Sequence, residues 1–238
     1  MKKITLIITT MFIFVNASLA DLSGLSIGVS GGSNTLTTVG LETPADSLSD
    51  SNRGTTRASK QDDIDIPSLF AEYTAQWKGL GLTVGAAIIP ATANIKSRGV
   101  VQTNVDETKC NEITDGSLCQ IQEVFTNQVS GKLSDHTTYY VQPGFVYKNT
   151  MIYGSFGMVT VDLEAKSVNG TSDNFTNNQT VTGTLEGAGI KQGFGDWFVK
   201  LDYSETDYDQ VSYNTSNNTN VKIDLDTEAT TFSIGRTF

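Results

Sequence analysis

The chain ends with the stretch Ala229-Thr230-Thr231-Phe232-Ser233-Ile234-Gly235-Arg236-Thr237-Phe238, in which large apolar and small or polar side chains alternate. The apolar face of this stretch holds Phe232, Ile234 and Phe238. A period of two predicts a β-strand, whereas the free end of a soluble chain tends to fray into water. A membrane barrel needs a last strand that pairs with the first and places aromatic side chains at the lipid boundary. The stretch therefore predicts the closing strand of a transmembrane β-barrel.

The N-terminal residues have the pattern of a secretory signal peptide. Two lysines precede an apolar run at 4–15, and small residues follow up to Ala20. This run is shorter than the roughly 20 residues that a membrane-spanning helix needs, so we expect cleavage after residue 20. A buried N-terminal helix is the alternative. The expected organisation is a signal peptide at 1–20 and one outer-membrane β-barrel domain at 21–238.

Charge and cysteine content narrow the class of protein. The net charge is −10 at pH 7, and phosphate binding needs a basic surface, so we expect no nucleic-acid partner. Cys110 and Cys119 lie close together in a polar stretch and predict one structural disulfide in an oxidising compartment, with free thiols as the alternative. A metal site would need more Cys or His nearby, and the chain has only His136. We therefore expect no metal and no cofactor.

Eight segments alternate in side-chain character as strands do. They lie at about 25–30, 69–77, 81–88, 139–147, 151–163, 185–192, 197–204 and from about 229 to the end. Long polar stretches, predicted to be loops, alternate with short turns; the long stretches lie at about 32–65, 91–135, 165–181 and 208–225. Outer-membrane barrels sort their connections by length in this way. We therefore expect an all-β fold: an eight-stranded antiparallel up-and-down transmembrane β-barrel with long extracellular loops.

Two other architectures remain open. A soluble β-sandwich could also carry eight short strands, although it has no reason to sort its loops by length. The stretch 91–135 has room for two further strands, which would make ten; we expect instead a hairpin that rises above the membrane and is closed near its tip by the disulfide. The segment 151–163 is apolar on both faces, so its orientation is left unassigned.

The two faces of the predicted strands differ in polarity as those of a membrane barrel do. One face is apolar and carries aromatic residues that would form interfacial girdles. The other face carries residues that we expect to form a polar network inside the barrel: Glu72, Gln76, Gln142, Lys200 and Asp202. Charges in a confined interior are costly unless they are paired. Lys200 is therefore expected to pair with Glu72 or Asp202, in a structural role.

Three stretches resemble the OmpA-like and opacity-type family of small outer-membrane barrels. The hairpin made by Tyr140-Val141-Gln142-Pro143-Gly144-Phe145 and Met151-Ile152-Tyr153-Gly154-Ser155-Phe156-Gly157 is similar to the family's PG…YG..G pattern. Residues 187–192 resemble its Gly-x-Gly strand, and 197–208 resemble its seventh strand. The resemblance implies insertion by the barrel-assembly machinery, which would read the terminal strand. Arg236 departs from the family pattern, which usually has an outward aromatic residue there.

The predicted fold favours a non-enzymatic surface protein of the bacterial outer membrane. Side chains fill the interior of an eight-stranded barrel, so we do not expect a general diffusion pore. Long hydrated loops on a rigid scaffold commonly carry recognition. The expected partners are outer-membrane lipid and a host or environmental surface ligand that the loops bind for adhesion, and the chain is expected to be a monomer. Loops that only shield the surface are an equally open interpretation.

Particular residues leave two further activities open. A narrow porin-like channel could be lined by the charged residues Glu72, Lys191, Lys200 and Asp202. An outer-membrane lipid hydrolase would need a base, and His136, expected to be a solvated histidine at the barrel rim, is the sole candidate. We therefore expect no catalytic residue.

Overall fold

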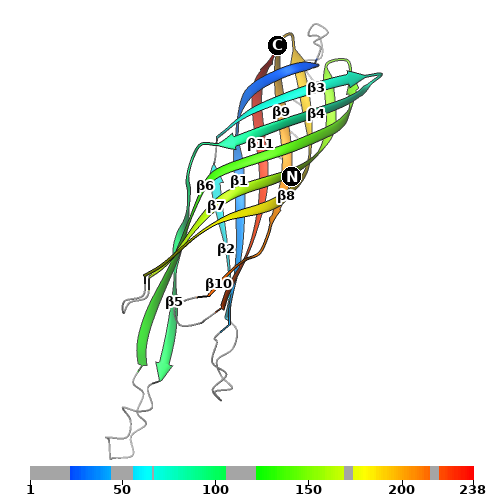
Figure 1. Cartoon of the computed structure of the whole chain (residues 1–238). Coiled ribbons are helices and arrows are strands. Elements are labelled where there is room, and N and C mark those ends of the chain that lie inside the picture. The colour runs from blue at the N-terminus through cyan, green and yellow to red at the C-terminus, as the bar shows by residue number, and fades with distance from the viewer. Residues whose placement is uncertain (1–21, 44–55, 66, 106–121, 169–173, 215–219) are drawn as a thin grey trace, which may run out of the picture.

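The computed structural model describes residues 22–43, 56–65, 67–105, 122–168, 174–214 and 220–238, and these form one antiparallel sheet (Figure 1). Its eleven strands are β1 (Gly24–Thr43), β2 (Thr56–Asp65), β3 (Ser68–Trp77), β4 (Leu80–Ile89), β5 (Ala93–Val105), β6 (Gln122–Tyr147), β7 (Thr150–Val168), β8 (Asn174–Phe194), β9 (Trp197–Tyr208), β10 (Val211–Asn214) and β11 (Asn220–Thr237). No helix within these ranges is long and apolar enough to cross a membrane. The expected signal peptide at 1–20 and both Cys110 and Cys119 lie outside the described residues.

The sheet closes into a ring of eight strands. Their order round the ring is β1, β3, β4, β6, β7, β8, β9 and β11, and β11 returns to pair with β1 from Thr237 opposite Ser26 onward. Each remaining strand extends a ring strand after a short interruption: β2 precedes β3, β5 follows β4, and β10 follows β9. The expected eight-stranded antiparallel barrel is confirmed.

Three two-residue turns gather at one end of the barrel, at the top of Figure 1, where the C-terminus also lies. They lie at 78–79, 148–149 and 195–196 and connect β3 to β4, β6 to β7 and β8 to β9. The backbone N–H of Phe238 donates to the carbonyl of Leu25 over 2.8 Å, so the first and last strands meet here. We name this end the turn end.

At the opposite end the strands extend much further than the alternation predicts. Residues expected to be loops at 32–65, 165–181 and 208–225 belong largely to β1, β2, β7, β8, β10 and β11. The expected strand ends are therefore wrong at this end of the barrel. Thr, Ser and Asn are frequent in these stretches, and a strand that is polar on its outer face and short of apolar residues resembles a loop in the sequence. In the stretch 91–135, β5 pairs with β6 as a hairpin, which is the arrangement we expected.

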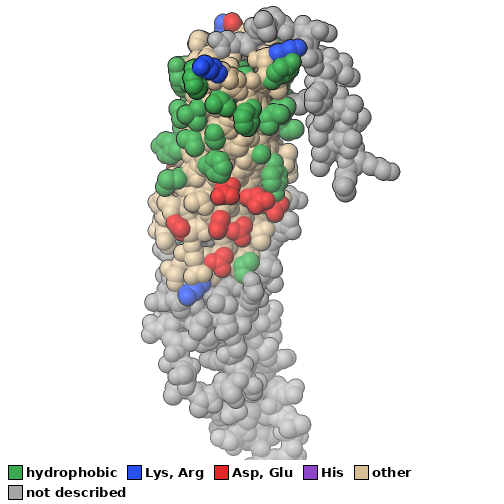
Figure 2. All heavy atoms as spheres, turned by 90° about the vertical axis from the view of Figure 1, so that its right-hand side faces the viewer, with side chains coloured by type: hydrophobic (Ala, Val, Ile, Leu, Met, Phe, Trp, Pro, Cys, Tyr) green, Lys and Arg blue, Asp and Glu red, His purple; other side chains and the backbone are tan. Residues whose placement is uncertain are grey.

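The outer surface changes character along the barrel axis. Near the turn end it carries an apolar band of exposed side chains (Figure 2), which lie within 25–29, 69–88, 139–147, 152–158, 197–203 and 232–238. Beyond this band, away from the turn end, the exposed side chains include several acids: Glu186, Glu205, Asp207, Asp224, Asp226 and Glu228. Glu205 stands directly opposite both Glu186 and Glu228 on the neighbouring strands. Like charges in this arrangement repel, so the surface beyond the band is strongly hydrated and acidic.

The polarity of the interior side chains changes along the axis in the opposite direction to that of the outer surface. At the level of the apolar band it holds polar and charged residues, whereas beyond the band it holds a cluster of buried apolar residues: Leu36, Val159, Val161, Leu163, Val181, Tyr208, Val211 and Leu225. The segment 151–163 crosses this change. Ile152 and Met158 face outward in the band, whereas Val159 and Leu163 are buried in the cluster. Both faces of the segment are apolar because one contributes to the band and the other to the core beyond it.

Two glycines lie beneath aromatic rings at the seam between the first and last strands. Gly28 of β1 lies opposite Gly235 of β11, and Phe70 and Phe198 occupy the adjacent positions on β3 and β9. A Cβ added to Gly28 would lie 2.4 Å from Phe70 Cζ, and one added to Gly235 would lie 2.3 Å from Phe198 Cζ. The two rings, whose centroids are 6.2 Å apart, therefore fill the space that the glycines leave.

We expect Gly235→Ala to destabilise the barrel by about 1–3 kcal/mol, because the added methyl group displaces the buried Phe198 ring. Urea unfolding in detergent micelles measures this loss. Phe198→Leu in the same chain should restore part of it. Gly31→Ala, where a Cβ meets no atom within 4 Å, should leave the free energy of unfolding unchanged; equal losses at the two glycines would refute the explanation.

Candidate functional site

The barrel interior at the level of the apolar band is organised around the carboxylate of Glu72. Lys191 Nζ of β8 lies 2.9 Å from its Oε1 atom, and Lys200 Nζ of β9 lies 3.0 Å from its Oε2 atom. The hydroxyl of Tyr140 on β6 donates to Oε2 over 2.8 Å. Glu72 and both lysines are at most 4% exposed. Three ring strands are therefore tied to β3 across the interior of the barrel.

Neutral polar groups and aromatic rings complete the coordination of the two lysines. Lys200 Nζ donates to Gln142 Oε1 over 3.4 Å, and Gln142 Nε2 donates to Ser155 Oγ over 3.0 Å. Lys191 Nζ donates to Thr74 Oγ1 over 3.4 Å and lies 4.1 Å from the centroid of the Phe198 ring. A cation over an aromatic face is stabilised by the ring quadrupole. Each ammonium group therefore has several partners in place of water.

Asp202 supplies the second negative charge of the interior. Its Oδ1 atom accepts a hydrogen bond from the Tyr153 hydroxyl over 2.5 Å. The carboxylates of Asp202 and Glu72 balance the ammonium groups of Lys191 and Lys200, so this set of four charges is neutral. A charge-balanced set with complete hydrogen bonding is the condition under which buried ions are tolerated.

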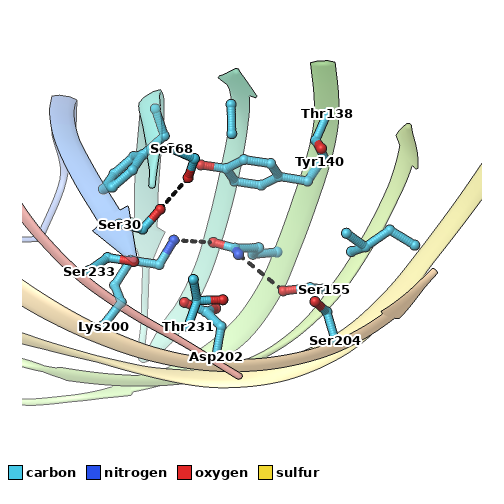
Figure 3. Close-up of a pocket in the computed structure, with 14 residues that line it drawn as sticks. Ser30, Ser68, Thr138, Tyr140, Ser155, Lys200, Asp202, Ser204, Thr231 and Ser233 are labelled. Carbon is cyan, nitrogen blue, oxygen red and sulfur yellow. Dashed lines mark hydrogen bonds between the residues drawn. The ribbon is translucent and has the colours of Figure 1, made fainter. Parts of the chain in front are cut away.

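A chamber of about 140 Å³ adjoins the charged network (Figure 3). Lys200 and Asp202 line it together with hydroxyl groups from around the ring: Ser30, Ser68, Thr138, Tyr140, Ser155, Ser204, Thr231 and Ser233. Phe70, Ala87 and Leu185 contribute apolar side chains to the same lining. The hydroxyl and charged groups give water molecules hydrogen-bond partners in a space of this size. Toward the turn end the interior is filled by a second apolar cluster, made by Leu22, Phe70, Met151, Tyr153 and Phe198. The chamber is therefore set between two apolar clusters along the axis of the barrel.

The residues predicted for the interior network lie in two groups. Glu72, Gln142 and Lys200 are joined by hydrogen bonds, and Asp202 lines the same chamber. Gln76 lies apart from them, with its amide oxygen placed to accept from the backbone N–H groups of Leu22 and Ser23 at 3.0 and 3.2 Å. Gln76 therefore holds the segment Leu22–Ser23, which directly precedes β1.

The sequence interpretation missed three members of the network. Lys191 was considered only as a possible lining residue of a channel, and Tyr140 and Tyr153 were named only as part of the hairpin that resembles the OmpA-like and opacity-type family. All three occupy inward positions of their strands. The alternation that selected Gln142 could have found Lys191 and Tyr140, whereas Tyr153 lies in the segment 151–163, which is apolar on both faces. Phe232, Ile234 and Phe238 of the terminal strand lie exposed on the outer face. Among the described residues no group of three or more His, Cys, Asp or Glu could hold a metal ion.

His136 is not the solvated rim residue that the sequence interpretation expected. It lies at an irregularity in the pairing of β6 with β7, next to Asp135, whose φ is 51°. Its Nε2 atom lies 3.3 Å from the hydroxyl of Tyr208, and Nδ1 is buried with no partner among the residues that the structure describes. Burial lowers the pKa of His136 to about 4, so the ring is neutral at pH 7. A bulge of this kind re-aims a side chain, here toward the interior.

Comparisons with known proteins concern the fold. No protein-family model and no characterised protein sequence matches the chain. A solved structure of the outer membrane protease OmpT from Escherichia coli is similar, with a TM-score of 0.51 and 12% identity over 93% of this chain and 100% of that one. The attachment invasion locus protein Ail of Yersinia pestis, in complex with the heparin analogue sucrose octasulfate, has a TM-score of 0.36 and 12% identity over 89% of this chain and 99% of that one. Neisserial surface protein A has a TM-score of 0.29 and 10% identity over 91% and 98%.

The chain thus has the fold of the outer-membrane β-barrel proteins, in agreement with the expected location in the bacterial outer membrane. The expectation that the chain is not an enzyme is contradicted by the similarity to OmpT, which is a protease built on such a barrel. A barrel of this class does not exclude catalysis, and the inference from fold to absence of activity was wrong.

We expect Glu72→Gln to lower the free energy of unfolding by about 3–5 kcal/mol, because it leaves two buried ammonium groups facing a neutral amide. Urea unfolding in micelles measures the loss. The second change Lys191→Met should recover part of it, since Lys200 and Asp202 then balance each other. Glu205→Gln, at an exposed acid, is the matched control; a loss as large as that of Glu72→Gln would contradict the buried network.

The single histidine gives a pH-dependent prediction. An unfolded chain binds a proton at His136 below pH 6.5, whereas the folded chain does so only below about 4. Stability should therefore fall as the pH decreases through this window, by on the order of 3 kcal/mol relative to His136→Gln, which has no titrating ring. An NMR titration of the ring in micelles gives the folded pKa directly. A midpoint near 6.5 would show a solvated ring and refute the prediction.

Proposed function

We propose that the chain is a surface-displayed outer-membrane β-barrel protein whose filled barrel anchors long extramembrane strands and loops for adhesion or recognition. The observation that carries the proposal is the inversion of polarity along the axis. An apolar outer band surrounds a polar interior near the turn end, and an acidic outer surface surrounds an apolar core beyond it. The first arrangement suits lipid and the second suits water.

The orientation of the barrel across the membrane follows from the lengths of the connections between its strands. Two-residue turns at 78–79, 148–149 and 195–196 suit the periplasmic side, where outer-membrane barrels have short turns. The strands that extend beyond the apolar band then project from the cell. The finer proposal is a member of the OmpA-like and opacity-type barrels, exported by the signal peptide at 1–20, inserted by the barrel-assembly machinery and monomeric. The resemblance of residues 140–157 and 187–208 to that family supports it.

The filled interior favours the interpretation of the barrel as a membrane anchor and not as a channel. Ions would have to pass the paired charges of Glu72, Lys191 and Lys200 and then two apolar clusters, at the turn end and beyond the apolar band. Breaking a buried ion pair costs several kcal/mol, and an apolar constriction excludes water. The narrow-channel alternative therefore requires rearrangement of the network that holds the ring strands together.

The extramembrane surface also limits the kind of ligand that would bind near the membrane. Asp207 stands opposite Asp226, and partial burial, together with the charge of Asp207, raises the pKa of Asp226. Glu186, Glu205 and Glu228 form an adjacent row. These charges repel sulfated or phosphorylated polymers and favour neutral or basic partners.

The test compares cells that display the natural chain with cells whose chain has residues 106–121 replaced by a short Gly-Ser linker. Both chains should migrate as a compact band on SDS gels without boiling and more slowly after boiling, because the ring is unchanged. The variant should adhere less to plates coated with extracellular-matrix proteins or an epithelial cell layer. Neither purified chain should conduct in planar lipid bilayers. Natural chains that fold but adhere no better than empty cells would contradict recognition and leave shielding.

A further inference from the structure

Two neighbouring turns at the turn end share an unusual sequence feature. In Trp77-Lys78-Gly79 and in Tyr147-Lys148-Asn149 a lysine follows an aromatic residue and adopts a positive φ, 49° for Lys78 and 56° for Lys148. Two-residue hairpin turns of this kind favour Asn, Asp or Gly at that position. The third turn at this end follows the rule with Gly195, at φ 64°. Turn formation therefore does not explain the two lysines.

The two lysines lie on adjacent turns and point along the aromatic residues that precede them. The backbone N–H of Val146 donates to the carbonyl of Gly79 over 2.8 Å, which ties the two turns together. Lys78 Nζ lies 4.7 Å from the centroid of the Trp77 ring, and Lys148 Nζ lies 5.5 Å from that of Tyr147. Within the described part of the chain neither lysine forms an ion pair, whereas Arg236 at the same end is paired with Asp196 at 3.4 Å. Among the residues that the structure describes, no carboxylate therefore pairs with either ammonium group.

A groove of about 780 Å³ opens on the lipid-facing surface beside these turns. It opens on the outside of the barrel, because most of the side chains that line it are exposed on the outer face, whereas Gln76, Gly81, Gly144 and Tyr153 form its floor between the strands. Small or short side chains are among the residues that line it: Ala75, Pro143 and Gly154. Larger exposed side chains border it: Trp77, Leu80, Leu82, Phe145, Ile152 and Phe156. The lining is almost wholly apolar, and Trp77 belongs both to the groove and to the cation–π pair with Lys78.

We propose that this groove and the two lysines bind an anionic phospholipid of the inner leaflet. The acyl chain lies in the groove, and the phosphate lies between the ammonium groups of Lys78 and Lys148. An apolar groove bordered by Trp77, beside two turns whose lysines form no ion pair within the described residues, matches a molecule with an apolar tail and a negatively charged head. Trp and Tyr side chains beside the lysines suit the same headgroup region. The inference rests on the proposed function in one respect, that the turn end faces the periplasm.

The test uses the two tryptophans of the chain as reporters of lipid contact. In Trp197→Phe the remaining Trp77 lines the groove. The variant is reconstituted into phosphatidylcholine vesicles that contain a fixed fraction of dibrominated phosphatidylglycerol or dibrominated phosphatidylcholine, and quenching of Trp fluorescence gives the relative affinity at the groove. A basic residue at an anionic lipid surface strengthens binding by roughly fivefold. We therefore expect a preference of at least that size for phosphatidylglycerol.

Three variants separate the site from a general effect of charge. Lys78→Asn with Lys148→Asn, on the Trp197→Phe background, should abolish the preference while improving the turns, because Asn adopts positive φ readily. Lys132→Asn with Lys222→Asn, at exposed lysines beyond the apolar band, should leave the preference intact. In Trp77→Phe the remaining reporter is Trp197, whose neighbour Arg236 is already paired with Asp196. This variant should show equal quenching by the two lipids.

The outcomes distinguish the lipid site from the barrel itself. Equal quenching of Trp77 by the two lipids, in a chain with a normal heat-dependent gel shift, overturns the lipid site and leaves the proposed function standing. A preference that survives loss of both lysines, or that Trp197 shows equally, overturns the role of the lysines. No quenching of either tryptophan would show that the band does not face lipid, and would overturn the proposed function as well.

Discussion

The structure depends on closure of the sheet between its first and last strands. Inside a hydrocarbon layer no water can satisfy a backbone N–H or C=O group, so a sheet is tolerated only when it has no free edge. The ladder from Ser26 opposite Thr237 removes that edge. Gly28 and Gly235 bring the strands close at this seam, and Phe70 and Phe198 cover them from the inside. The ring of eight, and the narrow interior that it encloses, follow from this closure.

The narrow interior determines the chemistry that it can hold. Inward side chains at the level of the apolar band have little bulk water available, so each charge needs a partner from another strand. Glu72 meets this need for Lys191 and Lys200, and Asp202 balances the total. The ion pairs join β3 to β8 and β9 across the barrel, which adds cross-links that backbone pairing of neighbours does not supply. The same cross-links obstruct conduction, which favours an anchor that carries its function outside the membrane.

Beyond the apolar band the same strands continue, but water and not lipid surrounds their outer face, so the placement of polar and apolar side chains is reversed. Water surrounds the outer face there, so acids such as Glu205 and Asp207 are placed outward, and apolar residues such as Val161 and Leu225 pack inside. One continuous sheet therefore serves as a membrane barrel at one end and as a water-soluble β-structure at the other. The boundary between the two regimes explains why His136, just beyond the band, is enclosed and neutral. At the other boundary, Lys78 and Lys148 extend the barrel toward charged headgroups.

The sequence by itself determined the fold class, the number of ring strands, the outward placement of Phe232, Ile234 and Phe238 and the inward placement of Glu72, Gln142 and Lys200. Each of these follows from an alternation with a period of two, which a single strand records without reference to its neighbours. Tertiary structure decided what depends on which strands lie side by side and on which solvent surrounds them. The partners of Lys191, the placement of Gln76 against Leu22 and Ser23 and the enclosure of His136 are contacts between distant segments. The segment 151–163 and the polar strand extensions could not be assigned from alternation, because apolar faces point outward in lipid and inward in water, and the sequence does not mark where one solvent replaces the other.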